Sequence, residues 1–85
     1  MTKFDKTKVF GGGYKWVNCA NSFYSEKAEE LDEALQGGEW VHIYIDCIGH
    51  TRAEIEGRNY VKWLTEKYGN RLQVEEYQGY NVRLA

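Results

Sequence analysis

The sequence predicts an α+β fold, a two-layer sandwich with two helices on one face of a mixed four-stranded sheet, in the order β-α-β-α-β-β. Two segments repeat apolar residues at helical spacing, and several shorter segments alternate apolar with polar residues. Glycines separate these segments, and proline is absent. With 85 residues, 42% of them hydrophobic, the chain is expected to fold as a single domain spanning residues 1–85.

The first strand is expected at residues 14–20, directly after the turn that Gly11-Gly12-Gly13 provides. Residues 6–10 are a candidate for an additional short strand before this turn. The N-terminal quarter of the chain therefore predicts one or two strands and no helix.

The first helix is expected at residues 25–36, where the apolar residues follow a 4-3-4 spacing and form one narrow stripe. Ser25, or Ser22, can cap its first turn, and Gly37-Gly38 would end it. The stripe consists of Tyr24, Ala28, Leu31 and Leu35.

The central part of the chain predicts a strand at residues 39–48 and a second helix at residues 52–68. Thr51 and Glu54 have the spacing of a capping box, in which each side chain satisfies a backbone N–H of the first turn. Gly69 is the natural end of this helix.

Two strands complete the chain, at residues 71–77 and 80–84, joined by the two-residue loop Gln78-Gly79. Strand alternation then divides the sheet into a core face and an opposite face that no helix remains to cover. The expected core residues are Val17, Cys19, Val41, Ile43, Ile45, Leu72, Val74, Val82 and Leu84. The opposite face is expected to carry Tyr14, Trp16, Trp40, His42, Tyr44, Gln73, Glu75, Tyr77 and Arg83.

That opposite face carries too many large aromatic side chains to be left in water without a reason. The N-terminal segment or a second copy of the chain would cover it, which makes a homodimer one alternative. Docking of a foreign protein is another, since aromatic residues anchor protein interfaces. Stacking of nucleic-acid bases is the third.

The order of elements resembles that of the Alba proteins and of the C-terminal domain of translation initiation factor three. The resemblance covers most of the chain and concerns topology, because no motif is shared. It implies binding to RNA, DNA or the ribosome through basic residues. The loop that would carry those residues reads Gly49-His50-Thr51-Arg52 in this chain.

Charge is segregated along the chain. Residues 1–23 contain four lysines and one aspartate, whereas residues 24–46 contain seven acids and one lysine. Carboxylates three or four residues apart on a helix repel each other by roughly 0.2–0.5 kcal/mol per pair, so folding alone does not favour this arrangement. The acidic helix is either a solvated face or a surface that docks on a basic groove as a mimic of nucleic-acid phosphates. Its five acids are Glu26, Glu29, Glu30, Asp32 and Glu33.

These features predict a non-enzymatic inhibitor or adaptor that binds a larger protein or nucleoprotein complex with a basic surface. The contacts would come from the five acids together with Trp16, Trp40 and Tyr44. In size, charge segregation and absence of a recognisable catalytic motif, the chain resembles small phage-encoded inhibitors of host defence, anti-CRISPR proteins included. This resemblance implies a host complex that handles nucleic acid as the partner.

The N-terminal residues and the two cysteines predict the cellular compartment of the protein. No apolar run follows the first lysines, so no signal peptide is expected, and the two cysteines are expected to stay reduced in a cytoplasm. For a phage-encoded chain this would be the host cytoplasm. No cofactor and no membrane contact are expected.

Two further functions are alternatives. A small RNA- or DNA-binding domain would use the open sheet face with Lys3, Lys6, Lys8, Lys15, Arg52 and Arg83. A thiol enzyme would use Cys47, because the loop from Cys47 to Arg52 resembles the active-site loop of rhodanese, with its glycine at the third position instead of the fourth.

Alternation places Cys47 on the buried face, which favours a structural thiol. Cys47 and His50 have a plausible spacing for two metal ligands, with Cys19, His42 or Asp46 as candidate third ligands. A second ligand pair of this kind is missing from the sequence, so no metal site is expected.

Overall fold

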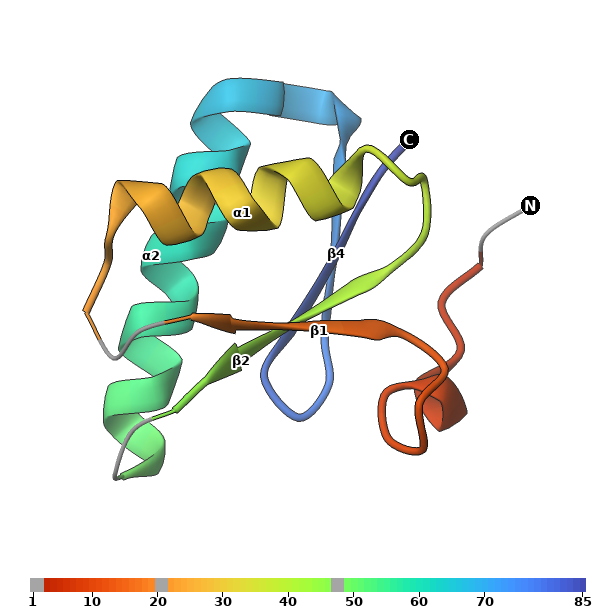
Figure 1. Ribbon diagram of the computed structural model, residues 1–85, viewed down its shortest axis with the longest axis horizontal. Helices are drawn as coiled ribbons and strands as arrows, with labels where there is room; N and C mark the ends of the chain where they lie inside the picture. Colours follow the sequence, from red (N-terminus) through yellow and green to blue (C-terminus); the bar gives the residue numbers. More distant parts are fainter. Residues whose placement is uncertain (1–2, 20–21, 47–48) are drawn as a thin grey trace.

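The computed structural model describes residues 3–19, 22–46 and 49–85, and it confirms the α+β sandwich and its element order. Figure 1 shows the two helices packed across a twisted sheet. The elements are η1 (Lys6–Lys8), β1 (Lys15–Cys19), α1 (Ser25–Leu35), β2 (Val41–Ile45), α2 (His50–Tyr68), η2 (Gly69–Arg71), β3 (Leu72–Glu76) and β4 (Tyr80–Leu84).

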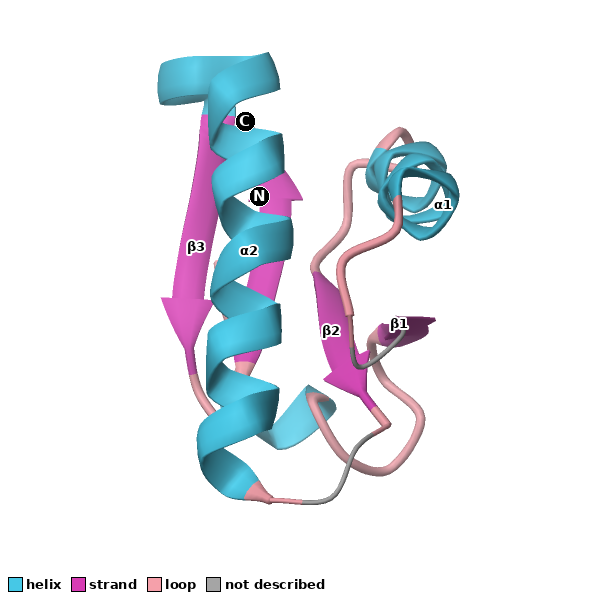
Figure 2. Cartoon of the chain, turned by 90° about the vertical axis from the view of Figure 1, so that its left-hand side faces the viewer, coloured by secondary structure: helices cyan, strands magenta, loops and turns pink. Residues whose placement is uncertain are grey.

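The four strands form one open sheet in the order β1-β2-β4-β3. β1 and β2 run parallel, with α1 as the connection between them, and β4 is antiparallel to both of its neighbours. Figure 2 shows α2 extended along β3 and β4, with α1 seen end-on beside β2 and β1. The pairing of β2 with β4 ends at Ile43 and Tyr80, so the last two residues of β2 extend beyond the β3–β4 hairpin.

The main core lies between the helices and one face of the sheet. Three residues of the predicted stripe, Ala28, Leu31 and Leu35, are fully buried there together with Tyr60 and Leu64 of α2, whereas Tyr24 is exposed. Burial of each such side chain stabilises the fold by roughly 1.5–3 kcal/mol. The strand residues of this core are Val17, Cys19, Val41, Ile43, Tyr80, Val82 and Leu84. Val74 was expected in the core but is exposed, because β3 is an edge strand.

A second, smaller core forms at the N-terminal segment. Val9, Tyr14 and Trp40 are buried together, and Phe4 and Tyr77 pack against them. The N-terminal segment therefore covers part of the sheet face that no helix covers. The alternative in which the N-terminal segment covers this face is thus confirmed in part, because Tyr14 and Trp40 are buried beneath it.

The segment 6–10 does not form the additional strand proposed from the sequence. Residues 6–8 form a single 3₁₀ turn instead. The Asp5 carboxylate accepts hydrogen bonds from the backbone N–H and the hydroxyl of Thr7, at 3.0 and 2.6 Å. This local capping satisfies backbone groups that a strand would have needed a partner strand to satisfy.

α1 begins at the predicted residue but without the predicted cap, and α2 begins two residues before its predicted start. α1 has no side-chain cap; Ser25 is its first residue, and the carbonyl of Tyr24 accepts hydrogen bonds from the first turn. The capping box of Thr51 and Glu54 does not form, because α2 begins at His50 after Gly49, whose φ of 99° glycine readily adopts. In the described part of the chain, no helix has both the length and the apolar character needed to cross a membrane.

The β3–β4 hairpin has three loop residues, because Glu76 pairs with Tyr80. The predicted two-residue loop is therefore wrong. Tyr77 leaves the strand, and its ring lies 6.4 Å from that of Phe4 in the smaller core. The Asn81 amide donates to the carbonyl of Tyr77 at 3.0 Å and fixes this longer loop.

Candidate interaction surface

The acids of α1 divide into two groups. Glu26, Glu29 and Glu33 are exposed and form no ion pair within the described residues. Glu30 is also exposed, but its carboxylate lies 3.1 Å from Lys27 Nζ. These four carboxylates are accessible to solvent on the side of α1 that faces away from the core.

Asp32 has a different environment from the other four acids. Its carboxylate lies 2.6 Å from Lys67 Nζ and accepts a hydrogen bond from the Tyr68 hydroxyl. Burial raises the pKa of Asp32, but the hydrogen bonds from Lys67 and Tyr68 outweigh it and hold the pKa below its usual value. Asp32 therefore joins α1 to the end of α2.

Three aromatic side chains remain exposed on the sheet face opposite the helices. Phe10, Trp16 and Tyr44 are 49%, 39% and 38% exposed. The Trp16 ring stacks on Tyr44 with centroids 5.3 Å apart, and Phe10 meets Trp16 edge-on at 5.6 Å. We call Phe10, Trp16 and Tyr44 the aromatic cluster. Trp40, also predicted as a contact residue, is only 4% exposed and lies outside this cluster.

Hydrogen bonds fix Trp16 of the aromatic cluster and the His42 ring beneath it. Trp16 Nε1 donates to the carbonyl of Val9 at 2.6 Å, which fixes the indole ring. The His42 ring lies beneath it, 4.7 Å from Trp16, and His42 Nδ1 is 2.8 Å from Asn81 Oδ1. Because both groups are buried and paired, the cluster is presented on a rigid base.

Burial lowers the pKa of His42, and the hydrogen bond to Asn81 opposes this only in part. Below pH about 6.5, the unfolded chain therefore takes up a proton on His42 that the folded protein resists. We expect the free energy of unfolding to fall as the pH drops from 7 to 5, and His42→Gln to weaken this dependence. Urea denaturation between pH 5 and 7 measures this pH dependence of the free energy of unfolding, with His50→Gln as the control. Equal slopes for wild type and His42→Gln would contradict the assignment.

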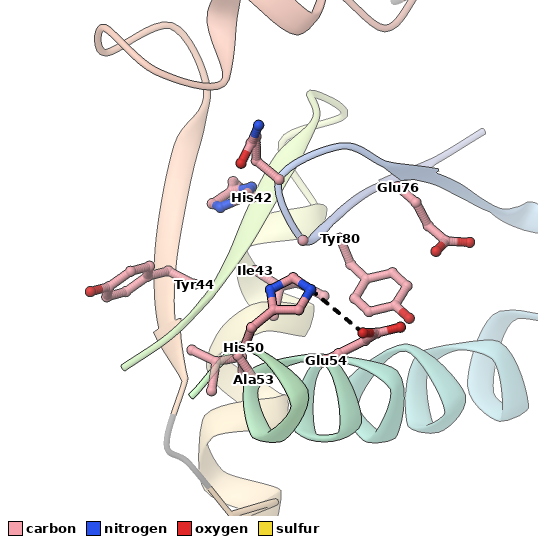
Figure 3. A pocket seen from close by; sticks show the side chains of 12 residues that line it. His42, Ile43, Tyr44, His50, Ala53, Glu54, Glu76 and Tyr80 are labelled. Atoms are coloured by element: carbon pink, nitrogen blue, oxygen red, sulfur yellow. Dashed lines mark ion pairs between the residues drawn. The ribbon is translucent and has the colours of Figure 1, made fainter. Parts of the chain in front are cut away.

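A pocket of about 400 Å³ lies at the C-terminal end of β2, between the β3–β4 hairpin and the first half of α2. Figure 3 shows Tyr80, His50 and Glu54 on one side of β2, whereas Tyr44 projects to the other side. Gly57 of α2 is required here, because a Cβ atom at this position would lie 2.7 Å from the Tyr80 ring. The full lining is His42, Ile43, Tyr44, Ile45, His50, Ala53, Glu54, Gly57, Glu76, Gln78, Gly79 and Tyr80.

The acids of α1 and the aromatic residues were predicted to form one interface, but they lie on different sides of the protein. α1 covers one face of the sheet, and the aromatic cluster lies on the opposite face. A flat interface cannot contain both. The pocket borders β2 at Tyr44, whose ring projects to the other side of this strand and belongs to the aromatic cluster. Sequence reasoning missed Phe10 and the acidic pocket residues Glu54 and Glu76.

The structure offers little thiol chemistry in the described residues. Cys47 lies outside them. Burial, with a contribution from Glu30, raises the pKa of the Cys19 thiol to about 12, so Cys19 is not a thiolate at neutral pH. Within residues 3–19, 22–46 and 49–85, no group of three or more histidine, cysteine, aspartate or glutamate side chains is placed to hold a metal ion.

Comparisons with protein-family models, curated proteins and solved structures found no match. The resemblances to Alba proteins, to translation initiation factor three, to rhodanese and to phage-encoded inhibitors therefore stay predictions.

Proposed function

We propose that this chain is a non-enzymatic binding protein, an inhibitor or adaptor that docks on a larger protein with a basic surface. The aromatic cluster anchors the complex, and the exposed acids of α1 attract and orient the partner. The partner class proposed is a protein or nucleoprotein complex that handles nucleic acid, in the host cytoplasm for a phage-encoded chain.

The observation that carries this proposal is the exposure of three contacting aromatic side chains on a rigid sheet face. The N-terminal segment buries Tyr14 and Trp40 but leaves Phe10, Trp16 and Tyr44 in solvent. Interface energy concentrates in a few tryptophan, tyrosine and arginine residues, and a pre-ordered cluster loses little entropy on binding. An aromatic surface of this kind is therefore suited to be the centre of an interface.

The charge pattern supports a basic partner. Glu26, Glu29 and Glu33 have no internal ion pair among the described residues, so their field extends into solvent. Such carboxylates raise the association rate with a positively charged surface and weaken as salt is added. Because α1 lies on the other sheet face, we assign its acids to steering or to a partner that wraps around the β1 edge.

Affinity capture from a host lysate, at low and at high salt, tests the proposal. Glu29→Lys with Glu33→Lys is expected to remove partner capture or to lower it about ten-fold, because it replaces attraction by repulsion. Glu39→Lys with Glu66→Lys is the control, since it makes the same change in net charge at exposed sites outside α1. Equal capture by the two double variants would contradict a role for α1.

A second candidate function is binding of single-stranded nucleic acid. The stacked pair of Trp16 and Tyr44 on an open sheet also suits base stacking. Lys6 and Lys8 lie in the segment that leads into Phe10. Quenching of tryptophan fluorescence by a single-stranded RNA, with affinity that falls steeply with salt, would favour this function over protein binding.

A further inference from the structure

The pocket beside the aromatic cluster exists because β2 is longer than its pairing with β4. Pairing stops at Ile43 and Tyr80, and the hairpin turns away at Gly79. Tyr44 and Ile45 therefore have β1 as their only partner strand in the described sheet. Their other edge faces the pocket, which leaves a short length of strand edge next to a cavity.

The lining of this pocket has a distinct chemistry. Two carboxylates, Glu54 and Glu76, lie at the rim near the Tyr80 ring, and Ile43 and Ala53 provide apolar surface below. Carboxylates beside an aromatic ring favour a cation, and apolar walls favour the methylene stem that a lysine or arginine side chain carries.

The charge of Glu54 is only loosely balanced by its neighbours. Arg58 Nη2 is 3.6 Å and His50 Nε2 is 3.7 Å from the Glu54 carboxylate, both beyond a good charge-assisted hydrogen bond. Both partner side chains are exposed, but Arg58 also forms a hydrogen bond with the Tyr80 hydroxyl and faces Glu76 as well as Glu54. Glu76 forms no ion pair within the described residues. An incoming cation therefore has to displace the exposed Arg58 guanidinium from these two carboxylates.

We propose that this pocket binds one lysine or arginine side chain of the partner protein. Its volume of about 400 Å³ is near the lower end for ligand pockets, which suits a single side chain better than a large cofactor. This inference rests on the proposed function, because it assigns a specific contact to the same interface.

Two features favour a side chain of a polypeptide over a free amine. Only the strand β2 separates the pocket from the Tyr44 ring of the aromatic cluster, so a protein that docks on the cluster and extends past the end of β2 reaches the pocket. The unpaired edge of Tyr44 and Ile45 can in addition accept a short extended main chain, as sheet edges do when they bind peptides.

An NMR titration tests the pocket without the partner. The probes are N-acetyl-lysine methylamide, N-acetyl-arginine methylamide and the neutral N-acetyl-norleucine methylamide. We expect the two cationic probes to shift the amide signals of Gly57 and Gly79, which line the pocket, and the neutral probe to bind at least about five-fold more weakly. Equal binding of all three probes, or no shift at these glycines, would overturn the cation site.

The matched variants are Glu76→Gln and Glu75→Gln, which remove the same charge from neighbouring exposed residues of β3. Only Glu76 lines this pocket. Glu76→Gln is expected to weaken the cationic probes and the partner about five-fold, and Glu75→Gln to leave both unchanged. If Glu76→Gln weakens the probes but not the partner, the side-chain assignment is wrong and a free amine is the ligand. Tyr44→Ala still tests the proposed function separately.

Discussion

Trp40→Ala is expected to lower the free energy of unfolding by about 3–5 kcal/mol, the range for a large aromatic residue deleted from a core. Trp40 is almost fully buried, and the Phe4 ring meets it edge-on at 5.1 Å. Its loss leaves a cavity at the point where the N-terminal segment attaches to the sheet. Urea denaturation followed by circular dichroism measures the change.

Trp16→Ala is the control for Trp40→Ala, because Trp16 is a partly exposed tryptophan on the same sheet face. We expect a cost of about 1–2 kcal/mol, from lost packing and the lost hydrogen bond to Val9. Trp40→Ala should therefore cause the larger loss of stability, whereas Trp16→Ala should cause the larger loss of partner binding per folded molecule. Equal losses of stability would contradict the division into a structural and an interface tryptophan.

Tyr60→Ala is expected to have a similarly large effect, about 3–5 kcal/mol, in the main core. Tyr60 is fully buried, and the Phe23 ring packs against it at 4.9 Å. Its hydroxyl accepts a hydrogen bond from the Tyr24 N–H and donates to the carbonyl of Ser22, both at 3.2 Å. These bonds hold the chain where it enters α1, so the variant should also loosen the start of that helix.

Tyr60→Phe separates the hydroxyl from the ring. It keeps the packing and is expected to cost about 1–2 kcal/mol, since two backbone groups lose their partner. Hydrogen exchange at the first turn of α1 should accelerate in Tyr60→Phe while exchange in β2 and β4 stays slow. A Tyr60→Ala variant with wild-type stability would contradict the placement of this residue in the core.

The periodicity of the sequence predicted the elements well, because burial of one face dictates it. Three of the four residues in the 4-3-4 stripe and the alternating apolar residues of β2 and β4 belong to the core, whereas Tyr24 of the stripe is exposed. The caps of the two helices were mispredicted, although α1 begins at the predicted Ser25, because caps depend on tertiary contacts. Tyr24 precedes α1 since its N–H is held by Tyr60, and no local signal in the sequence encodes that bond.

The candidate site was only partly predictable. Alternation placed Trp16 and Tyr44 on one face correctly, but it also placed Trp40 there without showing that the N-terminal segment would bury it. The spacing of the α1 acids could not reveal that Asp32 pairs with Lys67, which is distant in sequence. The pocket depends on where the pairing of β2 with β4 ends, and the local pattern of neither strand reveals this register.

The partner's dissociation constant for Tyr44→Ala, compared with that for Tyr24→Ala, tests the role of the aromatic cluster most directly. Both are exposed tyrosines, but Tyr24 precedes α1 on the helix side of the molecule. An interface centred on the aromatic cluster predicts that Tyr44→Ala weakens the partner about thirty-fold, as expected for an interface hot spot, and that Tyr24→Ala changes it little. Equal dissociation constants for wild type and Tyr44→Ala, with both proteins folded, would contradict that interface.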